Sequence, residues 1–314
     1  MQIAVVGNLT LDMLGHVELL PGVNEVSVVR ETRQYFGGWA GNIATILQHL
    51  GLQTSLFAVA GNDFVDSGYE AHLSHLGVDI DNVAIITNQK CAHFFEYKDY
   101  QHNSFAFFQP NVEQEYYDSV LQRMFDFSKY YLVCLAKFGS DEVTNHFLQR
   151  ILENRKLILA VALGHILYLG DKELLTRILS SARYIFMNQT EAQNFLSMMG
   201  FNYLQDAFSL PGIRLDAIIT TQGEQGSTIY SLSQREPIHI RTVPPKRLIS
   251  TLGAGDTYMG AFLSGVAKGW KLQKCGEFAS TFSSFVVENE GVQTFLPAWE
   301  ELEQRFFEVF HYHF

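Results

Sequence analysis

The chain of 314 residues has only three cysteines, 22 basic residues and no long hydrophobic run. Its cysteines, Cys91, Cys134 and Cys275, are odd in number and widely spaced, which argues against a disulfide framework and favours reduced thiols in a cytoplasmic protein. No local motif supports a catalytic cysteine. Apolar runs such as 157–163 are far shorter than the roughly 18 residues of a membrane-spanning helix. Residues 1–7 lack a basic region and predict a first strand rather than a signal peptide.

Positive charge is scarce and is not clustered. The chain carries 33 acidic residues and a net charge of −11, with no run rich in lysine or arginine. This balance disfavours both nucleic acids and anionic membranes as partners. With 47% hydrophobic residues, the chain is long enough for one large domain with a substantial core.

Several common site signatures are also missing. The first strand is followed by the segment 7–12 (GNLTLD) instead of Gly-x-Gly-x-x-Gly, so a dinucleotide-dependent oxidoreductase loses its main support. No Walker A sequence is present, which excludes a phosphate cradle of the P-loop kind. His72 and His75 lie three apart on a polar helical segment with no further ligand nearby, so we interpret them as solvated surface residues.

Strand-like and helix-like segments alternate along most of the sequence. The predicted strands are 2–6, 54–60, 130–135, 157–162, 183–187 and 216–221. The predicted helices are 40–50, 66–76, 141–153, 171–181, 189–199, 256–268 and 272–288. This alternation predicts an α/β fold with a central, mostly parallel sheet covered by helices on both faces.

Two regions interrupt the alternation. Residues 24–36 and 83–108 read as short strands without helices between them, and aromatic residues in 91–97 and 104–108 flank a turn at 99–103. They predict a small β-sheet inserted into the α/β core. We therefore expect one domain, 1–314, with a lid formed by about 13–36 and 83–110.

The segment 250–257 (STLGAGDT) is the most informative part of the sequence. A turn built from Gly253, Ala254 and Gly255 at a helix start can direct several backbone N–H groups at one anion. Asp256 beside such a hole makes sense if the anion is a phosphoryl group in transfer and the carboxylate removes a proton from the attacking hydroxyl. The alternative is an ordinary turn with an N-capping aspartate.

Two segments near the N-terminus offer groups for a polar substrate. Asp12 follows the first strand, at the edge where open α/β sheets bind ligands, and could accept hydrogen bonds from a vicinal diol. Gly37 and Gly38 allow close approach of the backbone to a ligand, and Asn42 lies in the first turn of the following helix. The alternatives are a turn aspartate and a flexible loop before a helix.

Two further segments suit a nucleotide. Asn188 and Glu191 share one face of a helical first turn after a strand and suit hydrated Mg²⁺ and phosphate, although a capping pattern would look the same. Residues 220–227 (TTQGEQGS) form a tight turn whose backbone could follow phosphate or ribose, although a plain hairpin would look the same.

Taken in order, these motifs resemble those of the ribokinase-like, or PfkB, carbohydrate and nucleoside kinases, over nearly the whole chain. The motifs that carry the resemblance are 7–12, 37–42, 188–191, 221–226, 253–256 and 290–292. The resemblance implies a Rossmann-like core with a β-sheet lid, and ATP and Mg²⁺ as co-substrate and cofactor.

The resemblance also implies roles for individual residues. Asp256 would be the general base, beside an anion hole of Gly253, Ala254 and Gly255. Sugar hydroxyls would bind Asp12, Gly37, Gly38 and Asn42. Mg²⁺ would be held through water by Glu191. The nucleotide would contact Asn188, Thr221, Gly223, Gly226 and Asn289.

One departure from the family pattern concerns a monovalent cation. The family motif usually begins with an aspartate, which helps to build a cation site beside the anion hole, and this chain has Ser250 there. The replacement puts the cation site in doubt and leaves Asp256 unaffected.

The acceptor is left open between two classes. The aromatic hairpin resembles that of a bacterial and archaeal branch similar to adenosine kinases, and flat apolar side chains suit a purine. This favours a nucleoside, with a sugar such as ribose or fructose as the alternative, and a non-catalytic ligand sensor as a third reading. The same phenylalanines could instead form lid core or a homodimer interface.

Overall fold

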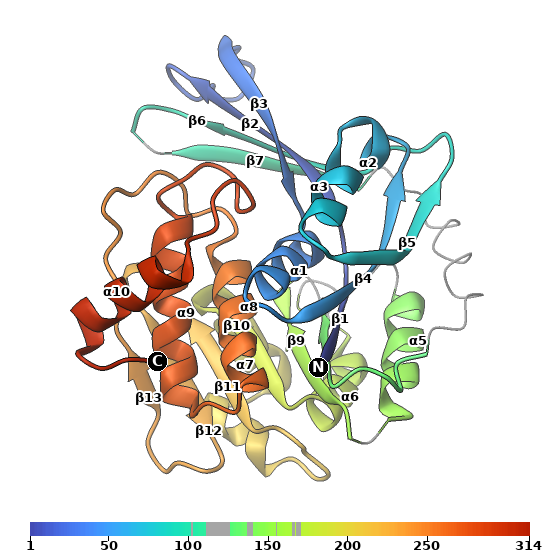
Figure 1. Ribbon diagram of the computed structural model, residues 1–314, viewed down its shortest axis with the longest axis vertical. Helices are drawn as coiled ribbons and strands as arrows, with labels where there is room; N and C mark the ends of the chain where they lie inside the picture. Colours follow the sequence, from blue (N-terminus) through green and yellow to red (C-terminus); the bar gives the residue numbers. More distant parts are fainter. Residues whose placement is uncertain (102, 111–125, 137–140, 155, 165–166, 168–170) are drawn as a thin grey trace.

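The computed structural model describes residues 1–101, 103–110, 126–136, 141–154, 156–164, 167 and 171–314. His102, in the predicted hairpin turn, lies outside them. The strands of the described residues form two sheets, a large one of nine strands and a small one of four (Figure 1). The strands of the large sheet, in spatial order, are β13 (Ile238–Ile240), β12 (Ser227–Ser231), β11 (Ala217–Thr221), β10 (Tyr184–Asn188), β9 (Ile158–Ala162), β8 (Leu132–Leu135), β1 (Gln2–Val6), β4 (Gln53–Gly61) and β5 (Asp79–Ile86).

The large sheet confirms the predicted α/β class. The seven strands from β11 to β5 in this order pair in parallel, and their central members are apolar and buried along their length, as strands covered on both faces must be. At one edge β12 and β13 continue the sheet antiparallel to β11. The hairpin from β11 to β12 is the turn that the sequence placed at 220–227.

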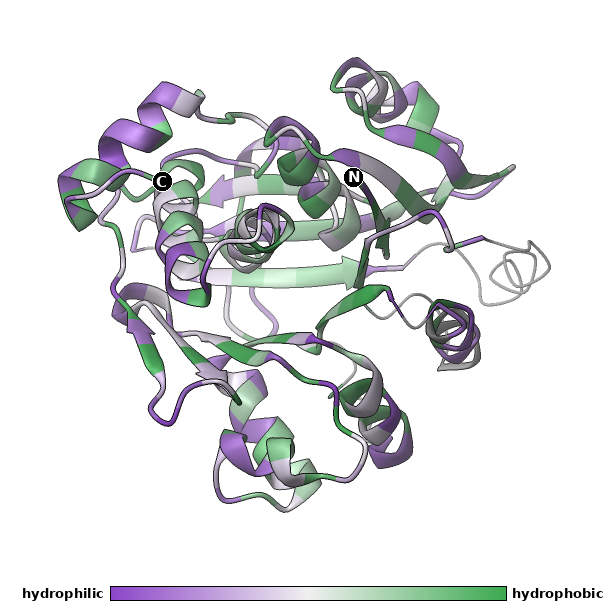
Figure 2. Cartoon of the chain, turned by 60° about the horizontal axis from the view of Figure 1, so that its bottom comes forward, coloured by the Kyte–Doolittle hydropathy of each residue, from purple (hydrophilic) through white to green (hydrophobic). Residues whose placement is uncertain are grey.

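Helices cover both faces of this sheet. They are α1 (Trp39–His49), α2 (Asp63–Asp66), α3 (Tyr69–His75), α5 (Asp141–Leu152), α6 (Lys172–Ser181), α7 (Gln189–Met199), α8 (Ala254–Ala267), α9 (Leu272–Val286) and α10 (Trp299–Phe310), with short 3-10 turns η2 (Leu204–Ser209) and η3 (Gly223–Gln225). Helices α1, α8 and α9 pack side by side. Figure 2 shows hydrophobic strands between helices that alternate hydrophobic and hydrophilic residues, the pattern of a buried sheet under amphipathic helices.

The small sheet projects from one edge of the core (Figure 1). Its order is β3 (Val29–Gly37), β2 (Thr10–Val17), β6 (Ala92–Lys98) and β7 (Ser104–Gln109). It differs in extent from the predicted insertion, because it begins at Thr10 instead of residue 13. Residues 83–86 lie in β5 of the large sheet, where parallel pairing with β4 continues the core.

The interior agrees with the sequence in one further respect. Cys91, Cys134 and Cys275 are all buried, and burial raises the pKa of each thiol, to about 12 for Cys91 and Cys275. Thiols of this kind are poor nucleophiles at neutral pH. Within the described residues, no helix combines the length and the apolar character needed to cross a membrane.

Candidate active site

Helix α8 begins directly after a glycine whose backbone conformation and surroundings disfavour any side chain. Gly253, the N-cap, has φ of 69°, and a Cβ there would lie 2.1 Å from Cγ2 of Val292. Its carbonyl accepts from the backbone N–H of Thr257 at 2.9 Å and from the hydroxyl of Thr257 at 2.8 Å. The N–H of Ala254 donates to the carbonyl of Thr251 at 3.2 Å. The first-turn N–H of Gly255 has no partner within an α-helix and is suited to an anion.

Gly255 differs from its neighbour because the protein itself does not require glycine there. A Cβ at this position would meet nothing within 4 Å, and the residue lies in the helical first turn with an exposed backbone. A glycine in a helix lowers the stability of the helix relative to alanine, and here no steric clash requires it. A ligand that must approach the N–H closely is a physical reason for glycine at this position.

Asp256 occupies the first turn of α8 and is partly buried. Its Oδ2 accepts a hydrogen bond of 2.8 Å from the side-chain amide of Asn42 in α1. Burial raises the pKa of Asp256 to about 7, the bond from Asn42 lowers it, and the charges of Asp12 and Glu191 raise it. A carboxylate with this pKa can accept a proton near neutral pH, which is the property of a general base.

Asp12 lies nearby, and its position differs in one detail from the prediction. It belongs to β2 of the small sheet, six positions beyond the end of β1. Its Oδ1 accepts from the hydroxyl of Thr10, and a Cβ on Gly37 would lie 2.0 Å from its Oδ2. Burial raises the pKa of Asp12 to about 6, the Thr10 bond lowers it, and the charge of Glu96 raises it.

The glycine-rich segment 37–42 packs closely against its neighbours. Gly38 has φ of 88°, and its absent Cβ would be 2.6 Å from the N of Thr10. A Cβ on Gly41 would lie 2.0 Å from the hydroxyl of Tyr69. The glycines therefore let three segments, the start of β2, the start of α1 and Tyr69, come into direct contact.

Sequence reasoning missed two buried residues that join this cluster. Gln293 donates from Nε2 to Oδ1 of Asn42 at 3.0 Å and to the hydroxyl of Tyr69 at 2.7 Å. Gln293 follows the 290–292 motif directly, which was the only available signal, and Tyr69 stands among ordinary helix residues. The sequence pattern predicts a solvated His72, but the structure shows it half-buried. Its ring centroid lies 5.0 Å from that of Phe36, and burial lowers its pKa.

Asn188 and Glu191 form the capping box of α7. The Asn188 side chain accepts from the N–H of Glu191 at 2.9 Å, and Oε2 of Glu191 accepts from the N–H of Asn188 at 2.8 Å. Locally, these two side chains therefore cap the N-terminus of α7, which is the alternative that the sequence also allowed. Burial raises the pKa of Glu191, the N–H of Asn188 lowers it, and the Glu191 charge acts on Asp256.

The predicted nucleotide residues are spread over two places. Thr221 ends β11, and Gly223 and Gly226 flank η3 in the hairpin that follows. Glycine at 226 is required by the fold, since a Cβ would lie 2.0 Å from the carbonyl oxygen of Ile240. Asn289 lies after α9, where its side-chain amide donates to the carbonyl of Phe285 at 3.0 Å.

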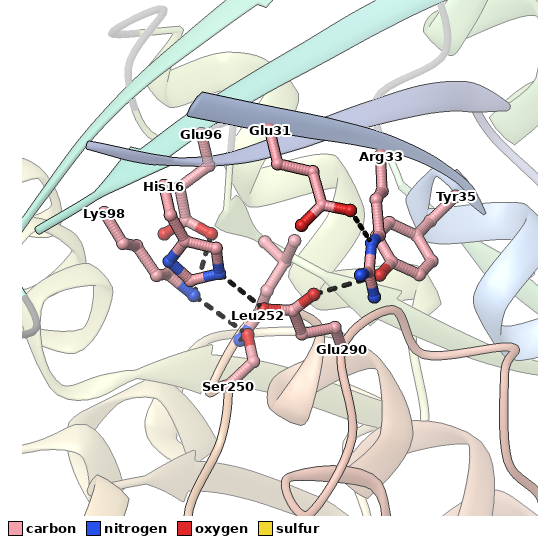
Figure 3. Close-up of polar contacts among 9 residues, drawn as sticks. All are labelled: His16, Glu31, Arg33, Tyr35, Glu96, Lys98, Ser250, Leu252 and Glu290. Atoms are coloured by element: carbon pink, nitrogen blue, oxygen red, sulfur yellow. Dashed lines mark hydrogen bonds and ion pairs between the residues drawn. The ribbon is translucent and has the colours of Figure 1, made fainter. Parts of the chain in front are cut away.

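Ser250 lies beneath the small sheet. The ammonium of Lys98 in β6 donates to its hydroxyl at 3.0 Å and pairs with Glu96 at 3.0 Å (Figure 3). A serine that accepts from an ammonium offers no anionic ligand to a metal cation. Ser250 therefore lacks the negative charge that the aspartate of the family pattern would offer to a monovalent cation.

A groove of about 460 Å³ separates the small sheet from the segment 289–294. Glu290 bridges it, because its carboxylate accepts from Nε2 of His16 at 2.9 Å and from the hydroxyl of Tyr35 at 2.9 Å (Figure 3). These bonds join β2 and β3 to the core on one side, and Lys98 joins β6 on the other. The groove is therefore spanned by polar contacts.

Strand register divides the aromatic residues of β6 and β7 between the two faces of the small sheet. Asp12 pairs with Phe94, and Phe94 pairs with Phe108, so these three side chains share the face toward the core. Phe105 and Phe107 have the opposite parity and lie on the outer face, 46% and 61% exposed. Only part of the aromatic hairpin can therefore face a bound ligand.

Among the residues that the structure describes, no group of three or more histidine, cysteine, aspartate or glutamate side chains could hold a metal ion.

Comparison with known proteins extends over the whole chain. The nucleoside kinase of Methanocaldococcus jannaschii is 30% identical over 307 residues, which cover 97% of this chain and 96% of that protein. The solved structure of the nucleoside kinase of this organism, described as an archaeal member of the ribokinase family, has a TM-score of 0.87, with 98% of each chain covered. The nucleoside kinase of Burkholderia thailandensis in complex with inosine has the same fold, with a TM-score of 0.87, 24% identity and 99% of each chain covered. The model of the pfkB family of carbohydrate kinases matches residues 1–299, and this chain belongs to that family.

Proposed function

We propose that this protein transfers the γ-phosphate of ATP to a primary hydroxyl of a nucleoside, with Asp256 as the general base. The observation that carries the proposal is the position of Asp256: a partly buried carboxylate with a pKa of about 7, one residue after the open N–H of Gly255. A base and an anion-binding N–H side by side are what in-line phosphoryl transfer to an alcohol requires.

The acceptor sugar binds between the two sheets. Asp12 accepts from its hydroxyls, and Asn42, which has one amide hydrogen on Asp256, donates the other to the sugar. Gly37 and Gly38 allow the ring to approach the backbone. The small sheet acts as a lid that excludes water from the reacting groups.

The proton moves from the acceptor hydroxyl to Asp256 as the hydroxyl oxygen bonds to phosphorus and the bond to the β-phosphate oxygen breaks. Negative charge on the transferred phosphoryl group is stabilised by the N–H groups of Gly253 and Gly255 and by the positive end of α8. The N–H of Ala254 joins them once it leaves the carbonyl of Thr251.

The nucleotide lies along the carboxyl ends of β10 and β11. Thr221, Gly223 and Gly226 line its phosphates and ribose, Asn188 contacts phosphate, and Asn289 borders the adenine. Glu191 suits Mg²⁺ held through water, since its carboxylate is half-buried and only one oxygen is used by the capping box. Mg²⁺ bound there would supply charge neutralisation on the phosphates.

A nucleoside is the acceptor that the small sheet supports best. Phe94 and Phe108 share the inner face with Asp12, so a base attached to a ribose held by Asp12 has an aromatic surface on which to stack. The similarity to nucleoside kinases supports the same choice.

A sugar kinase is the second candidate, because the inner face is polar beyond the two phenylalanines. His16, Glu31 and Arg33 are on this face (Figure 3). These side chains could hydrogen-bond the extra hydroxyls of a hexose or a free pentose.

The experiment is ATP consumption by the purified protein with Mg²⁺, against adenosine, inosine, other nucleosides, ribose, fructose and fructose phosphates. Turnover with nucleosides and none with free sugars supports the proposal. Turnover with a sugar alone is consistent with Asp256 as the base and identifies the protein as a sugar kinase, the second candidate. No turnover with any acceptor, from folded protein, favours a non-catalytic sensor.

The outer face of the small sheet suggests a homodimer. Every residue of edge strand β7 is exposed, including Phe105 and Phe107, and an exposed edge with apolar side chains favours association. Light scattering at several protein concentrations tests this.

A further inference from the structure

A continuous chain of hydrogen bonds runs from the backbone of Gly37 to the carboxylate of Asp256. The hydroxyl of Tyr69 donates to the carbonyl of Gly37 at 2.7 Å. Nε2 of Gln293 contacts the hydroxyl of Tyr69 at 2.7 Å and Oδ1 of Asn42 at 3.0 Å. Nδ2 of Asn42 then donates to Oδ2 of Asp256 at 2.8 Å.

Chemistry fixes the direction of every bond in this chain. A backbone carbonyl can only accept, so the single hydroxyl proton of Tyr69 points at Gly37. The hydroxyl oxygen must therefore accept from its other neighbour, and the atom of Gln293 that faces it must be the amide nitrogen. That nitrogen uses its second hydrogen on Asn42, which must present its oxygen to Gln293 and its nitrogen to Asp256.

Three of the four side chains in this hydrogen-bond chain are buried, and Asp256 at its end is partly buried. Tyr69 is fully buried, Asn42 is 4% exposed and Gln293 is 6% exposed. A Cβ on Gly41 would lie 2.0 Å from the Tyr69 hydroxyl, so glycine at this position leaves room for the hydrogen-bond chain. A buried amide that is turned over would leave polar groups without partners, which costs about 1–3 kcal/mol for each group.

We propose that Gln293 is a positioning residue, which holds the amide of Asn42 in the one orientation that gives an N–H to Asp256. The proposal rests on the proposed role of Asp256 as base. With the Asn42 amide turned over, its oxygen would face the carboxylate and disfavour the charged form, in which Asp256 accepts a proton.

Two charged side chains act on the same carboxylate. Asp12 of β2 and Glu191 of α7 both raise the pKa of Asp256, and the Asn42 amide of α1 is the hydrogen-bond donor that opposes them. Burial lowers the pKa of His72 in α3, and its interaction with Gln293 opposes that shift. Loss of the oriented donor therefore leaves the two repulsive charges unopposed.

The test replaces Gln293 by methionine, which has a similar length and cannot donate. In Gln293→Met we expect the acidic limb of the kcat–pH profile to move to higher pH by about one unit, the size of one hydrogen bond to a charged group. At pH 6.5 kcat falls about tenfold, and the deficit shrinks by pH 8.5. Tyr69→Phe, which removes the acceptor that orients Gln293, should shift the limb in the same direction by a smaller amount.

Thr45→Val is the matched control. The hydroxyl of fully buried Thr45 also donates to Gln293, at Oε1 over 3.2 Å, but this bond does not set the direction of the chain. Thr45→Val should lower the melting temperature with the acidic limb at its wild-type position. An equal shift in Thr45→Val, or no shift in Gln293→Met and Tyr69→Phe, overturns the positioning role.

A second measurement does not depend on activity. Carbon NMR of aspartate-labelled protein, assigned with Asp256→Asn, follows the ionisation of the Asp256 carboxyl directly. A higher pKa in Gln293→Met, together with an active Asp256→Asn enzyme, would retain the positioning role and refute Asp256 as base. An unchanged pKa with an inactive Asp256→Asn enzyme would do the reverse.

Discussion

The side-chain amide of Asn42 donates to the carboxylate of Asp256 across 2.8 Å, although the two residues are 214 positions apart. The contact exists because α1 and α8 pack against each other. It joins a sugar-binding candidate to the candidate base.

Asp256→Asn should lower kcat by several orders of magnitude, because the amide cannot accept the hydroxyl proton. Affinity for ATP and acceptor, measured by calorimetry, should change less than tenfold. Near-normal turnover would remove Asp256 as the base.

The same variant should be more stable than the wild type at pH 8 and equally stable below about pH 4. In the folded protein the pKa of Asp256 is about 7, above the unfolded value near 4, so stability decreases as the pH rises between these values. We expect an increase in melting temperature of a few degrees at pH 8. A variant that is less stable at pH 8 would contradict the raised pKa.

The kcat/KM profile of the wild type should fall on the acidic side with an apparent pKa near 7, as Asp256 becomes protonated. Asp12→Asn should move this limb to lower pH, since a like charge is removed. It should also raise KM for the acceptor about 10- to 100-fold through loss of a charged hydrogen-bond acceptor. A limb that stays in place would show that Asp12 does not act on the base.

Gly255→Ala should separate activity from stability. The fold has room for the methyl group, and alanine is the better helix residue, so the urea midpoint should stay equal or rise slightly. Activity should fall at least about 100-fold, because the methyl group blocks approach of the phosphoryl group to the anion hole. A fully active variant would place the phosphoryl group elsewhere.

Phe108→Ala and Phe107→Ala provide a matched pair on adjacent positions of β7. Phe108 shares the inner face with Asp12, and its truncation should raise KM for a nucleoside about 10- to 100-fold, the range of one stacking contact. Phe107 lies on the outer face, and its truncation should leave KM unchanged. Equal effects from the two would show that the sheet acts only as a scaffold.

Activity should not require a monovalent cation. The Lys98 ammonium contacts the Ser250 hydroxyl, where the family pattern usually has an aspartate. Exchange of K⁺ for tetramethylammonium at constant ionic strength should change kcat less than twofold. Strong activation by K⁺ would show that other groups bind it.

The sequence alone predicted the fold class and the candidate motifs, because both depend on local patterns. Continuous apolar runs predict buried parallel strands, and the segment 253–256 marks a helix N-terminus with an acidic residue. The sequence did not separate β5 from the small sheet, because a short amphipathic strand has the same sequence pattern in either sheet. The family membership predicted from the motifs was confirmed by the family match.

Tertiary structure alone decided which side chains meet. The pairing of Asn42 with Asp256, the buried chain through Tyr69 and Gln293, and the division of Phe107 and Phe108 between two faces depend on strand register and helix packing. Residues far apart in the sequence make these contacts, and no local pattern encodes them. The sequence determined which chemical groups are available, and packing of the two sheets determined the environment that raises the pKa of Asp256.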